Sequence, residues 1–105
     1  NNALSLWIVA MDGEKLVGYV GSQSVLGWSD MMNLAVLPEY RGMGIGKQLI
    51  TAIRDKALSD GHVRVGLIVD FDNPRAESLY TSLGFTRVGT RIFFGHKMWH
   101  MQYIK

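Results

Sequence analysis

The segment Arg41-Gly42-Met43-Gly44-Ile45-Gly46 stands between a short apolar run, residues 31–37, and a stretch with helical periodicity. Glycine at every second position lets backbone N–H groups approach a ligand with no side chain in the way. The exposed N–H groups and the dipole at the start of the following helix then favour an anion. This order of strand, glycine-rich turn and helix predicts a pyrophosphate-binding turn, although a tight turn without a ligand is the plainer alternative.

Two familiar nucleotide-binding motifs do not fit this segment. A Walker loop needs glycine at the position of Arg41 and serine or threonine at that of Gln48. A dinucleotide fingerprint needs glycine where Lys47 stands. Because both spacings fail, a nucleotide-phosphate binder is the least favoured interpretation of the glycine-rich segment.

The chain after the turn alternates between helix and strand signals. Apolar residues recur with helical spacing as far as Gly61, which is typical of a helix C-terminal cap. A β-branched strand over residues 63–69 follows, and Asn73-Pro74 begins a second helix that Gly84 ends. Two strand-like runs finish the chain, over residues 85–94 and 96–104.

The chain before the turn reads as three strands. Asp12-Gly13 predicts a hairpin between strands over residues 4–11 and 16–20, and a looser stretch, residues 21–30, precedes the apolar run. The whole order is β-β-β-α-β-α-β-β, a mixed α/β sheet. We expect the two strands joined through the long helix to be parallel, and the hairpins at both ends to add antiparallel strands.

The composition limits the class of protein. The chain has 105 residues, of which 48% are hydrophobic and 19% charged, with a formal net charge of +2 and no cysteine. These values predict a single domain over residues 1–105 and exclude a disordered chain, a disulfide scaffold and a thiolate metal site. The sequence has neither an apolar stretch of membrane-spanning length nor a basic run typical of nucleic-acid binding. The three histidines show no metal-ligand spacing, so we expect no metal, nucleic-acid or membrane partner.

Two motifs in this order resemble a known family. Residues 41–46 fit the pattern Arg/Gln-x-x-Gly-x-Gly/Ala of the GNAT superfamily of acyl-CoA-dependent N-acyltransferases. Tyr80 begins a run similar to the family's later Tyr-x-x-x-Gly-Phe signature, which ends here at Gly84-Phe85. The resemblance covers the chain from about Leu4 to the C-terminus and implies the GNAT fold. The family's N-terminal strand and helices have no counterpart before the first hairpin, so we expect an N-terminally truncated domain.

The resemblance also implies how acetyl-CoA, the co-substrate, is held. Its pantetheine arm is expected between the two central parallel strands, against main-chain groups of Leu34 and Val36, where an N–H aimed at the thioester oxygen acts as an oxyanion donor. Asn73 matches an asparagine that contacts the cofactor arm, and a role as helix N-cap is equally good chemistry. The pyrophosphate is expected on the glycine-rich turn, at Arg41, Gly42, Met43, Gly44, Ile45, Gly46 and Lys47.

Tyr80 matches the tyrosine that in the family protonates the departing CoA thiolate. A neutral phenol beside a developing thiolate suits a general acid. The alternative is a core role, because Tyr80 shares a helical face with Ala76 and Leu83. In either role the hydroxyl needs a partner.

Several acids are candidates for the group that accepts the proton of the attacking amine. Asp30 stands six residues before Val36, where histone-acetylating members of the family carry a glutamate, and its alternative is an acid in a turn. Other members carry a glutamate five residues before the asparagine, but Ile68 stands there. Asp70 and Asp72 are further candidates to accept a proton through water.

Taken together, the residues and the resemblance predict an N-acetyltransferase that moves an acetyl group from acetyl-CoA to a primary amine by direct attack. The acceptor is a small-molecule or a protein amine. The alternative is a CoA-binding regulatory or assembly module without catalysis, which Ile68 supports weakly. A homodimer would cover the exposed edge strand and apolar face that we expect. The lack of cysteine fits a reducing compartment, and we expect a cytoplasmic location.

Overall fold

The computed structural model describes residues 4–25 and 28–104, and within these ranges one mixed sheet carries two helices. The strands lie in the order β1-β2-β3-β4-β6-β5. The predicted element order, β-β-β-α-β-α-β-β, is confirmed. The elements are β1 (Leu4–Asp12), β2 (Lys15–Val25), β3 (Trp28–Val36), the 3-10 turn η1 (Pro38–Tyr40), α1 (Ile45–Ser59), β4 (Arg64–Asp70), α2 (Pro74–Ser82), β5 (Thr86–Phe93) and β6 (His96–Ile104).

Antiparallel hairpins form both flanks of the sheet, as predicted. β1 pairs with β2 around Gly13, whose φ of 63° is the left-handed conformation that the Asp-Gly turn requires. β5 pairs with β6, and Gly95 in the connection has a φ of 80°. The Asp-Gly turn read from the sequence therefore accounts for the first of the two outer strand pairs.

The prediction of a loose stretch over residues 21–30 is wrong for the part that the structure describes. β2 and β3 extend through it, with residues 26 and 27 outside the described ranges. Ser22 and Ser29 are buried, and the Ser24 hydroxyl donates to that of Ser29 at 3.1 Å. These side chains are polar, so hydropathy does not mark the strands, but they are small enough to be buried in the sheet.

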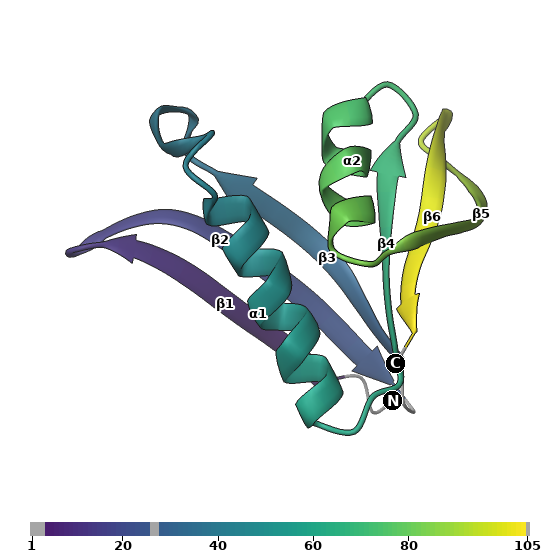
Figure 1. Ribbon diagram of the computed structural model, residues 1–105, viewed down its shortest axis with the longest axis horizontal. Helices are drawn as coiled ribbons and strands as arrows, with labels where there is room; N and C mark the ends of the chain where they lie inside the picture. The colour runs from purple at the N-terminus through teal and green to yellow at the C-terminus, as the bar shows by residue number, and fades with distance from the viewer. Residues whose placement is uncertain (1–3, 26–27, 105) are drawn as a thin grey trace.

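The central strands β3 and β4 are parallel, as predicted, but only over a short ladder. The ladder runs from Trp28 paired with Arg64 to Asp30 paired with Gly66, and beyond it the strands diverge (Figure 1). The sheet therefore has two arms that meet at this ladder. We call β1, β2, β3 and α1 the N-terminal arm, and β4, β5, β6 and α2 the C-terminal arm.

A β-bulge lies in β3 directly after the ladder. The register with β2 skips one residue of β3 between Met31 and Asn33. Met31 packs against the core, so its neighbour Asp30 points to the other face of the sheet. Leu34, beyond the bulge, lies opposite the buried Val20 and faces the helices. The bulge thus reverses the alternation of side chains where the two arms separate.

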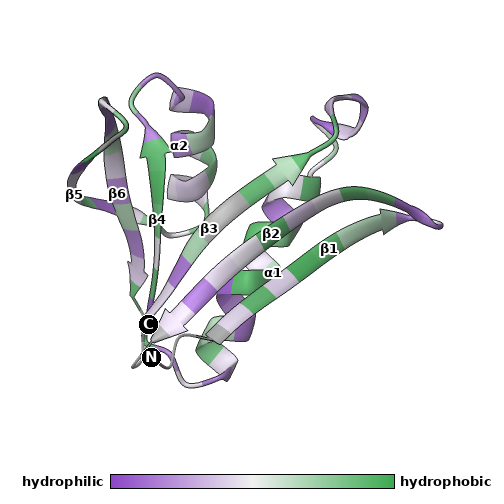
Figure 2. Ribbon diagram, turned by 180° about the vertical axis from the view of Figure 1, so that it is seen from behind, coloured by the Kyte–Doolittle hydropathy of each residue, from purple (hydrophilic) through white to green (hydrophobic). Residues whose placement is uncertain are grey.

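Both helices cover the same face of the sheet, as the front and back views show (Figures 1 and 2). We call the other face, which no helix of the described residues covers, the open face. The core beneath the helices forms two clusters, and α1 contributes to both. Ile50 and Ala57 belong to the cluster of the C-terminal arm, whereas Leu49 and Ile53 pack with Val20 in the N-terminal arm. The C-terminal cluster also contains Val65, Leu67, Val69, Phe85 and Met101.

The helices within the described ranges are short or amphipathic, and none of them is long and apolar enough to cross a membrane.

Candidate functional site

The glycine-rich turn ends at an uncapped helix N-terminus. Gly42 and Gly44 have φ values of 81° and 82°, and Gly44 is the N-cap residue of α1, where no side chain caps the helix. A Cβ added at Gly42, Gly44 or Gly46 would meet no other atom within 4 Å. The first N–H groups of α1 therefore have open space before them, which fits the anionic pyrophosphate predicted here.

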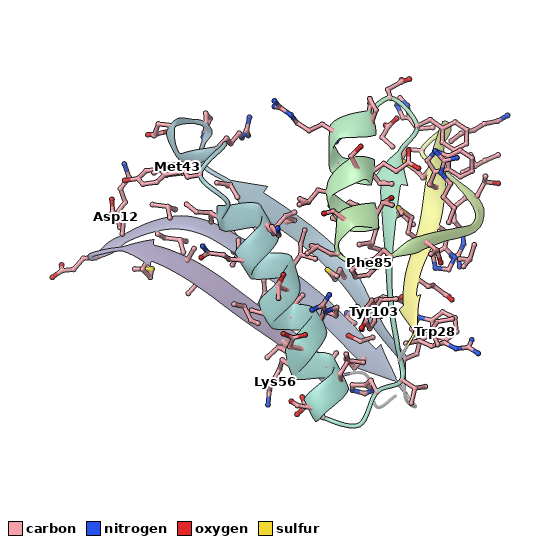
Figure 3. The ribbon with its side chains drawn as sticks, viewed as in Figure 1. Asp12, Trp28, Met43, Lys56, Phe85 and Tyr103 are labelled. Atoms are coloured by element: carbon pink, nitrogen blue, oxygen red, sulfur yellow. The ribbon has the colours of Figure 1, made fainter. Side chains whose placement is uncertain are left out.

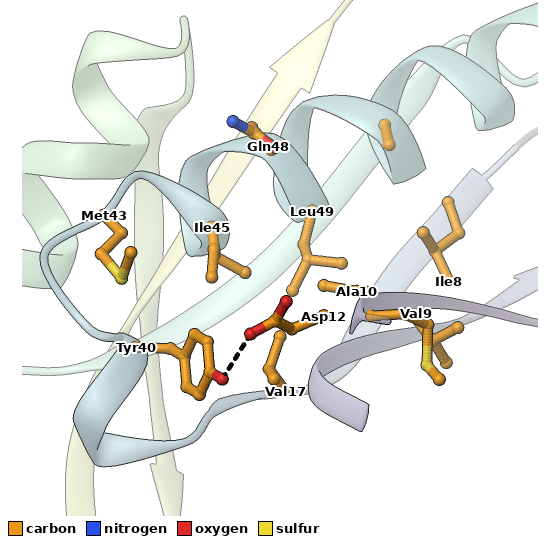
Figure 4. A pocket seen from close by; sticks show the side chains of 12 residues that line it. Ile8, Val9, Ala10, Asp12, Val17, Tyr40, Met43, Ile45, Gln48 and Leu49 are labelled. Carbon is orange, nitrogen blue, oxygen red and sulfur yellow. Dashed lines mark hydrogen bonds between the residues drawn. The ribbon is translucent and has the colours of Figure 1, made fainter. Parts of the chain in front are cut away.

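Two side chains tie this turn to the N-terminal arm. The Arg41 Nε donates to the Val36 carbonyl at 3.1 Å, at the end of β3. The Tyr40 hydroxyl donates to Asp12 Oδ2 at 2.7 Å, and this hydrogen bond raises the pKa of Tyr40 (Figure 4). Lys47, exposed in the first turn of α1, forms no ion pair with any described residue. The turn is thus anchored at its start, and the Lys47 ammonium is available to bind an anion.

Two cavities adjoin the turn on the N-terminal arm. The larger, about 520 Å³, lies between β1, η1 and α1 and is lined mostly by apolar residues such as Ile8, Val17 and Leu49, with Asp12 and Tyr40 at one side (Figure 4). The smaller, about 280 Å³, is lined by the ends of β2 and β3 together with Arg41. Neither of these two cavities is lined by a residue of β4 or α2.

The divergence of β3 from β4 leaves backbone groups of β3 without a ladder partner on that side. Leu34 and Val36, the two residues predicted to hold the cofactor arm, lie in this part of β3. Leu34 is 38% exposed although it faces the helical layer. The structure therefore brings these two residues and the glycine-rich turn together at the separated end of the arms.

Asn73 is the N-cap of α2, as its position before Pro74 predicts. Its Oδ1 accepts a hydrogen bond from the backbone N–H of Ala76 at 3.2 Å. The side chain is exposed at the C-terminal end of β4. Its predicted contact with the cofactor arm is compatible with the cap and stays a prediction.

Tyr80 lies on the face of α2 that packs against the C-terminal cluster. Its ring meets that of Phe85 edge-on, with 6.2 Å between the centroids. Burial raises the pKa of Tyr80, so the phenol stays protonated at neutral pH. Its hydroxyl has no hydrogen bond to any of the described residues. The Tyr80 ring is therefore part of the core packing, and its unpaired hydroxyl has a proton that it can donate to a ligand.

Asp30 belongs to β3, so the alternative interpretation as a turn acid is wrong. The indole N–H of Trp28 donates to Asp30 Oδ1 at 2.8 Å. Both side chains lie on the open face, at the narrow end where the two arms meet (Figure 3 labels Trp28 there). Tyr80 and Asp30 therefore lie on opposite sides of the sheet.

The other two candidate acids have a structural role in the turn between β4 and α2. Asp70 Oδ1 accepts a hydrogen bond from the backbone N–H of Asp72 at 2.8 Å. The Asp70 carbonyl accepts from the N–H of Asn73 at 3.0 Å. Among the described residues, neither carboxylate shares a hydrogen-bond partner with Asp30.

His100 is the residue of this region that the sequence analysis considered only as a metal ligand. It lies on β6 directly opposite Ile68 of β4, the position that the sequence resemblance marks as one of the two usual places for a base. His100 and Asp30 lie on the two strands that flank β4. The order of these strands has no local sequence signal, so the sequence could not place the two side chains near each other. Among the described residues, no group of three or more His, Asp and Glu side chains is arranged to hold a metal ion.

The comparison with protein families decides the identification. The model of the acetyltransferase (GNAT) family matches residues 1–85. The chain belongs to the GNAT acetyltransferase family. The N-alpha-acetyltransferase RimI of Mycobacterium tuberculosis (strain ATCC 25618 / H37Rv) is 41% identical to this GNAT chain over 90 residues. That match covers 81% of the GNAT chain and 54% of its relative, so the chain spans about half the length of that protein.

Solved structures support the same fold. The crystal structure of the ribosomal-protein-S18-alanine N-acetyltransferase from Escherichia coli superimposes with a TM-score of 0.89 at 25% identity, covering 95% of the GNAT chain and 68% of that chain. The PaiA N-acetyltransferase from Thermoplasma acidophilum, solved in complex with coenzyme A, gives a TM-score of 0.85 at 22% identity, with 96% and 61% covered. The mixed sheet with a short central parallel ladder is therefore the GNAT fold.

Proposed function

We propose that this chain binds acetyl-CoA and transfers its acetyl group to a primary amine. The observation that carries the proposal is the divergence of β3 and β4 beside an uncapped glycine-rich helix start. An anion at the first turn of α1 and an extended arm along β3 would satisfy the free backbone groups of both. The family membership and the coenzyme A in a structural relative support the same ligand.

The residues assigned to the cofactor divide between the turn and the strand. The N–H groups of residues 42–47, with the Lys47 ammonium and the free guanidinium nitrogens of Arg41, bind the pyrophosphate. The backbone of Leu34 and Val36 holds the pantetheine arm, and one of its N–H groups stabilises the oxygen of the reacting carbonyl. The first-turn geometry and the absence of a side-chain cap on α1 fit this ligand.

Acetyl-CoA supplies the acyl group, whose carbonyl carbon gains a bond to the amine nitrogen as its bond to sulfur breaks. Tyr80 donates its phenolic proton to the sulfur, a role for which burial and the absence of another partner prepare it. Asp30 accepts the proton that the amine nitrogen loses. Donor and acceptor on opposite sides of the sheet let the thiolate leave on one side while the amine approaches from the other.

The test is release of the CoA thiol from acetyl-CoA with a panel of amines. The mycobacterial relative named as an N-alpha-acetyltransferase makes a peptide α-amine the first acceptor to try, followed by lysine side chains and polyamines. Tyr80→Phe should lose most of the turnover and keep cofactor affinity. Turnover of no amine, with acetyl-CoA still bound, would instead support the non-catalytic module that Ile68 suggests. Failure to bind acetyl-CoA would contradict both functions.

A further inference from the structure

Three residues from three strands meet on the open face where the two arms join. Asp30 of β3 and Gly66 of β4 are the last pair of the short parallel ladder. His100 of β6 reaches the same place from one strand further along the sheet. The meeting point therefore lies directly before the divergence of β3 and β4, on the side of the sheet away from the helices.

Gly66 shows how close these side chains are. A Cβ added at Gly66 would lie 2.7 Å from Asp30 Oδ1 and 3.4 Å from His100 Nε2. The Trp28 Nε1 that donates to Asp30 would also be 3.4 Å away. The carboxylate and the imidazole thus border the same small space, which only glycine at position 66 leaves empty. No direct hydrogen bond joins Asp30 to His100 in the part of the chain that the structure describes, and one water can bridge two such groups.

The charged groups around His100 determine which ring nitrogen carries its proton. Arg91 Nη2, from β5, lies 3.5 Å from His100 Nδ1. Because guanidinium only donates, Nδ1 is the acceptor of the neutral ring, and Nε2 carries the proton on the side of Asp30. Burial and Arg91 lower the pKa of His100 while Asp30 opposes them, so the ring is neutral at pH 7. Arg64 of β4 lies over the Trp28 ring, 5.2 Å from its centroid.

We propose that His100 is a positioning residue for Asp30: its Nε2–H holds the carboxylate, through one water above Gly66, as the acceptor of the amine proton. The proposal rests on the proposed function and adds the residue that orients its base. In the transfer, the amine nitrogen bonds to the thioester carbon, the C–S bond breaks, and the amine proton goes to Asp30. Tyr80 protonates the sulfur, and both side chains then exchange protons with water.

The first test needs no catalysis. NMR of the histidine side chains in the full 105-residue chain should show His100 as the Nε2–H tautomer above its pKa. Asp30→Asn should lower the pKa of His100, and Arg91→Gln should raise it, since each removes one of the two opposing charges. An Nδ1–H tautomer, or a pKa of His100 that is the same in Asp30→Asn, would overturn the arrangement.

The second test is kinetic and uses a matched control on the same strand. His100→Leu should lower kcat with the best amine about tenfold, with the KM for acetyl-CoA unchanged, because a positioned base contributes more than that to proton transfer. His100→Gln, which keeps an N–H donor, should recover most of the rate. His96→Leu, an exposed histidine of β6, should keep the wild-type rate.

The two tests separate the possible failures. Equal rates in His100→Leu and His96→Leu would overturn the positioning role even if the wild type is an acetyltransferase. The same kcat in His100→Gln as in His100→Leu would also overturn it, because the donor would then be irrelevant. If the wild type turns over no amine, the proposed function fails, and the NMR experiment still decides whether His100 holds Asp30.

Discussion

The two arms of the sheet differ in how they are packed and in what they offer a ligand. The C-terminal arm packs around a cluster of seven buried residues, two of which, Ile50 and Ala57, come from α1; Phe85 and Met101 in this cluster have no exposed surface. The buried cluster of the N-terminal arm has three members, and Trp7 and Val9 on its open face are more than half exposed. The N-terminal arm also carries the glycine-rich turn, both cavities and the unpaired part of β3.

The site therefore depends on incomplete strand pairing between a densely packed arm and a sparsely packed one. A continuous ladder between β3 and β4 would satisfy the backbone groups proposed to hold the cofactor arm. α1 joins the arms because Ile50 packs into one cluster and Ile53 into the other. Two features therefore join the arms: the three residue pairs of the central ladder, and the packing of α1 against both clusters.

The largest expected effect is a loss of stability in the densely packed C-terminal arm. Phe85→Ala should lower the free energy of unfolding by about 3–5 kcal/mol, because it empties a fully buried ring position. Val20→Ala, at an equally buried position of the sparse arm, should cost about 2 kcal/mol. Urea denaturation measures both, with Ile92→Ala, 73% exposed, expected within about 0.5 kcal/mol of wild type. Equal losses for Phe85→Ala and Val20→Ala would contradict the difference between the arms.

Two glycines of the turn should respond to alanine with opposite signs. Gly44→Ala should destabilise the fold by about 1–2 kcal/mol, because a Cβ is strained at its φ of 82°. Gly46→Ala should stabilise it by about 0.5–1 kcal/mol, because Gly46 lies inside α1 and a Cβ there meets no atom within 4 Å. Thermal unfolding of the two variants checks the signs. The same sign for both would show that the turn is not held in this conformation.

Asn73 separates a capping role from a cofactor role. Asn73→Ala should cost about 1 kcal/mol of stability, since the N–H of Ala76 loses its acceptor. Asn73→Asp keeps the acceptor and should restore the stability. If Asn73 also contacts the cofactor arm, calorimetric titration should show weaker acetyl-CoA binding in Asn73→Asp than in wild type. Wild-type affinity in Asn73→Asp would leave the residue a cap alone.

The smallest effect concerns the ion pair between α2 and β5. Arg87 donates to Glu77, and this hydrogen bond holds the pKa of Glu77 below its usual value. A lowered acid pKa adds stability that is present above the ordinary glutamate pKa and is lost as the pH falls through the lowered one. Glu77→Gln should therefore reduce the fall in melting temperature between pH 6 and pH 3, with a small effect because the pair is partly exposed. An unchanged pH dependence would show that the pair adds nothing.

Much of the fold could be predicted because its signals are local. Asp12-Gly13 marks a hairpin turn, Asn73-Pro74 marks a helix start, and the glycines around Gly44 mark the change from strand to helix. Each of these depends on backbone conformations that few residue types adopt. The stretch around Ser22 and Ser29 was missed because a small polar side chain can be buried in a sheet without adding to a hydrophobic pattern.

The site could be predicted only where it is local or carried by a family motif. The glycine-rich turn and the cap at Asn73 have the geometry expected for them. The neighbourhood of Asp30, Gly66 and His100 could not be foreseen, because it requires the order of β3, β4 and β6 in the sheet. The bulge after Met31, which places Asp30 and Leu34 on opposite faces of the sheet, likewise depends on the pairing of β3 with β2.

We expect acetyl-CoA to bind between the glycine-rich turn and the unpaired part of β3. Titration of acetyl-CoA into ¹⁵N-labelled protein, followed by NMR, tests it most directly. The amides of residues 42–47, Leu34 and Val36 should shift together and saturate with one ligand. Shifts confined to Ile8, Ala10 and Leu49, which line the larger cavity, would place the ligand there instead and contradict the account.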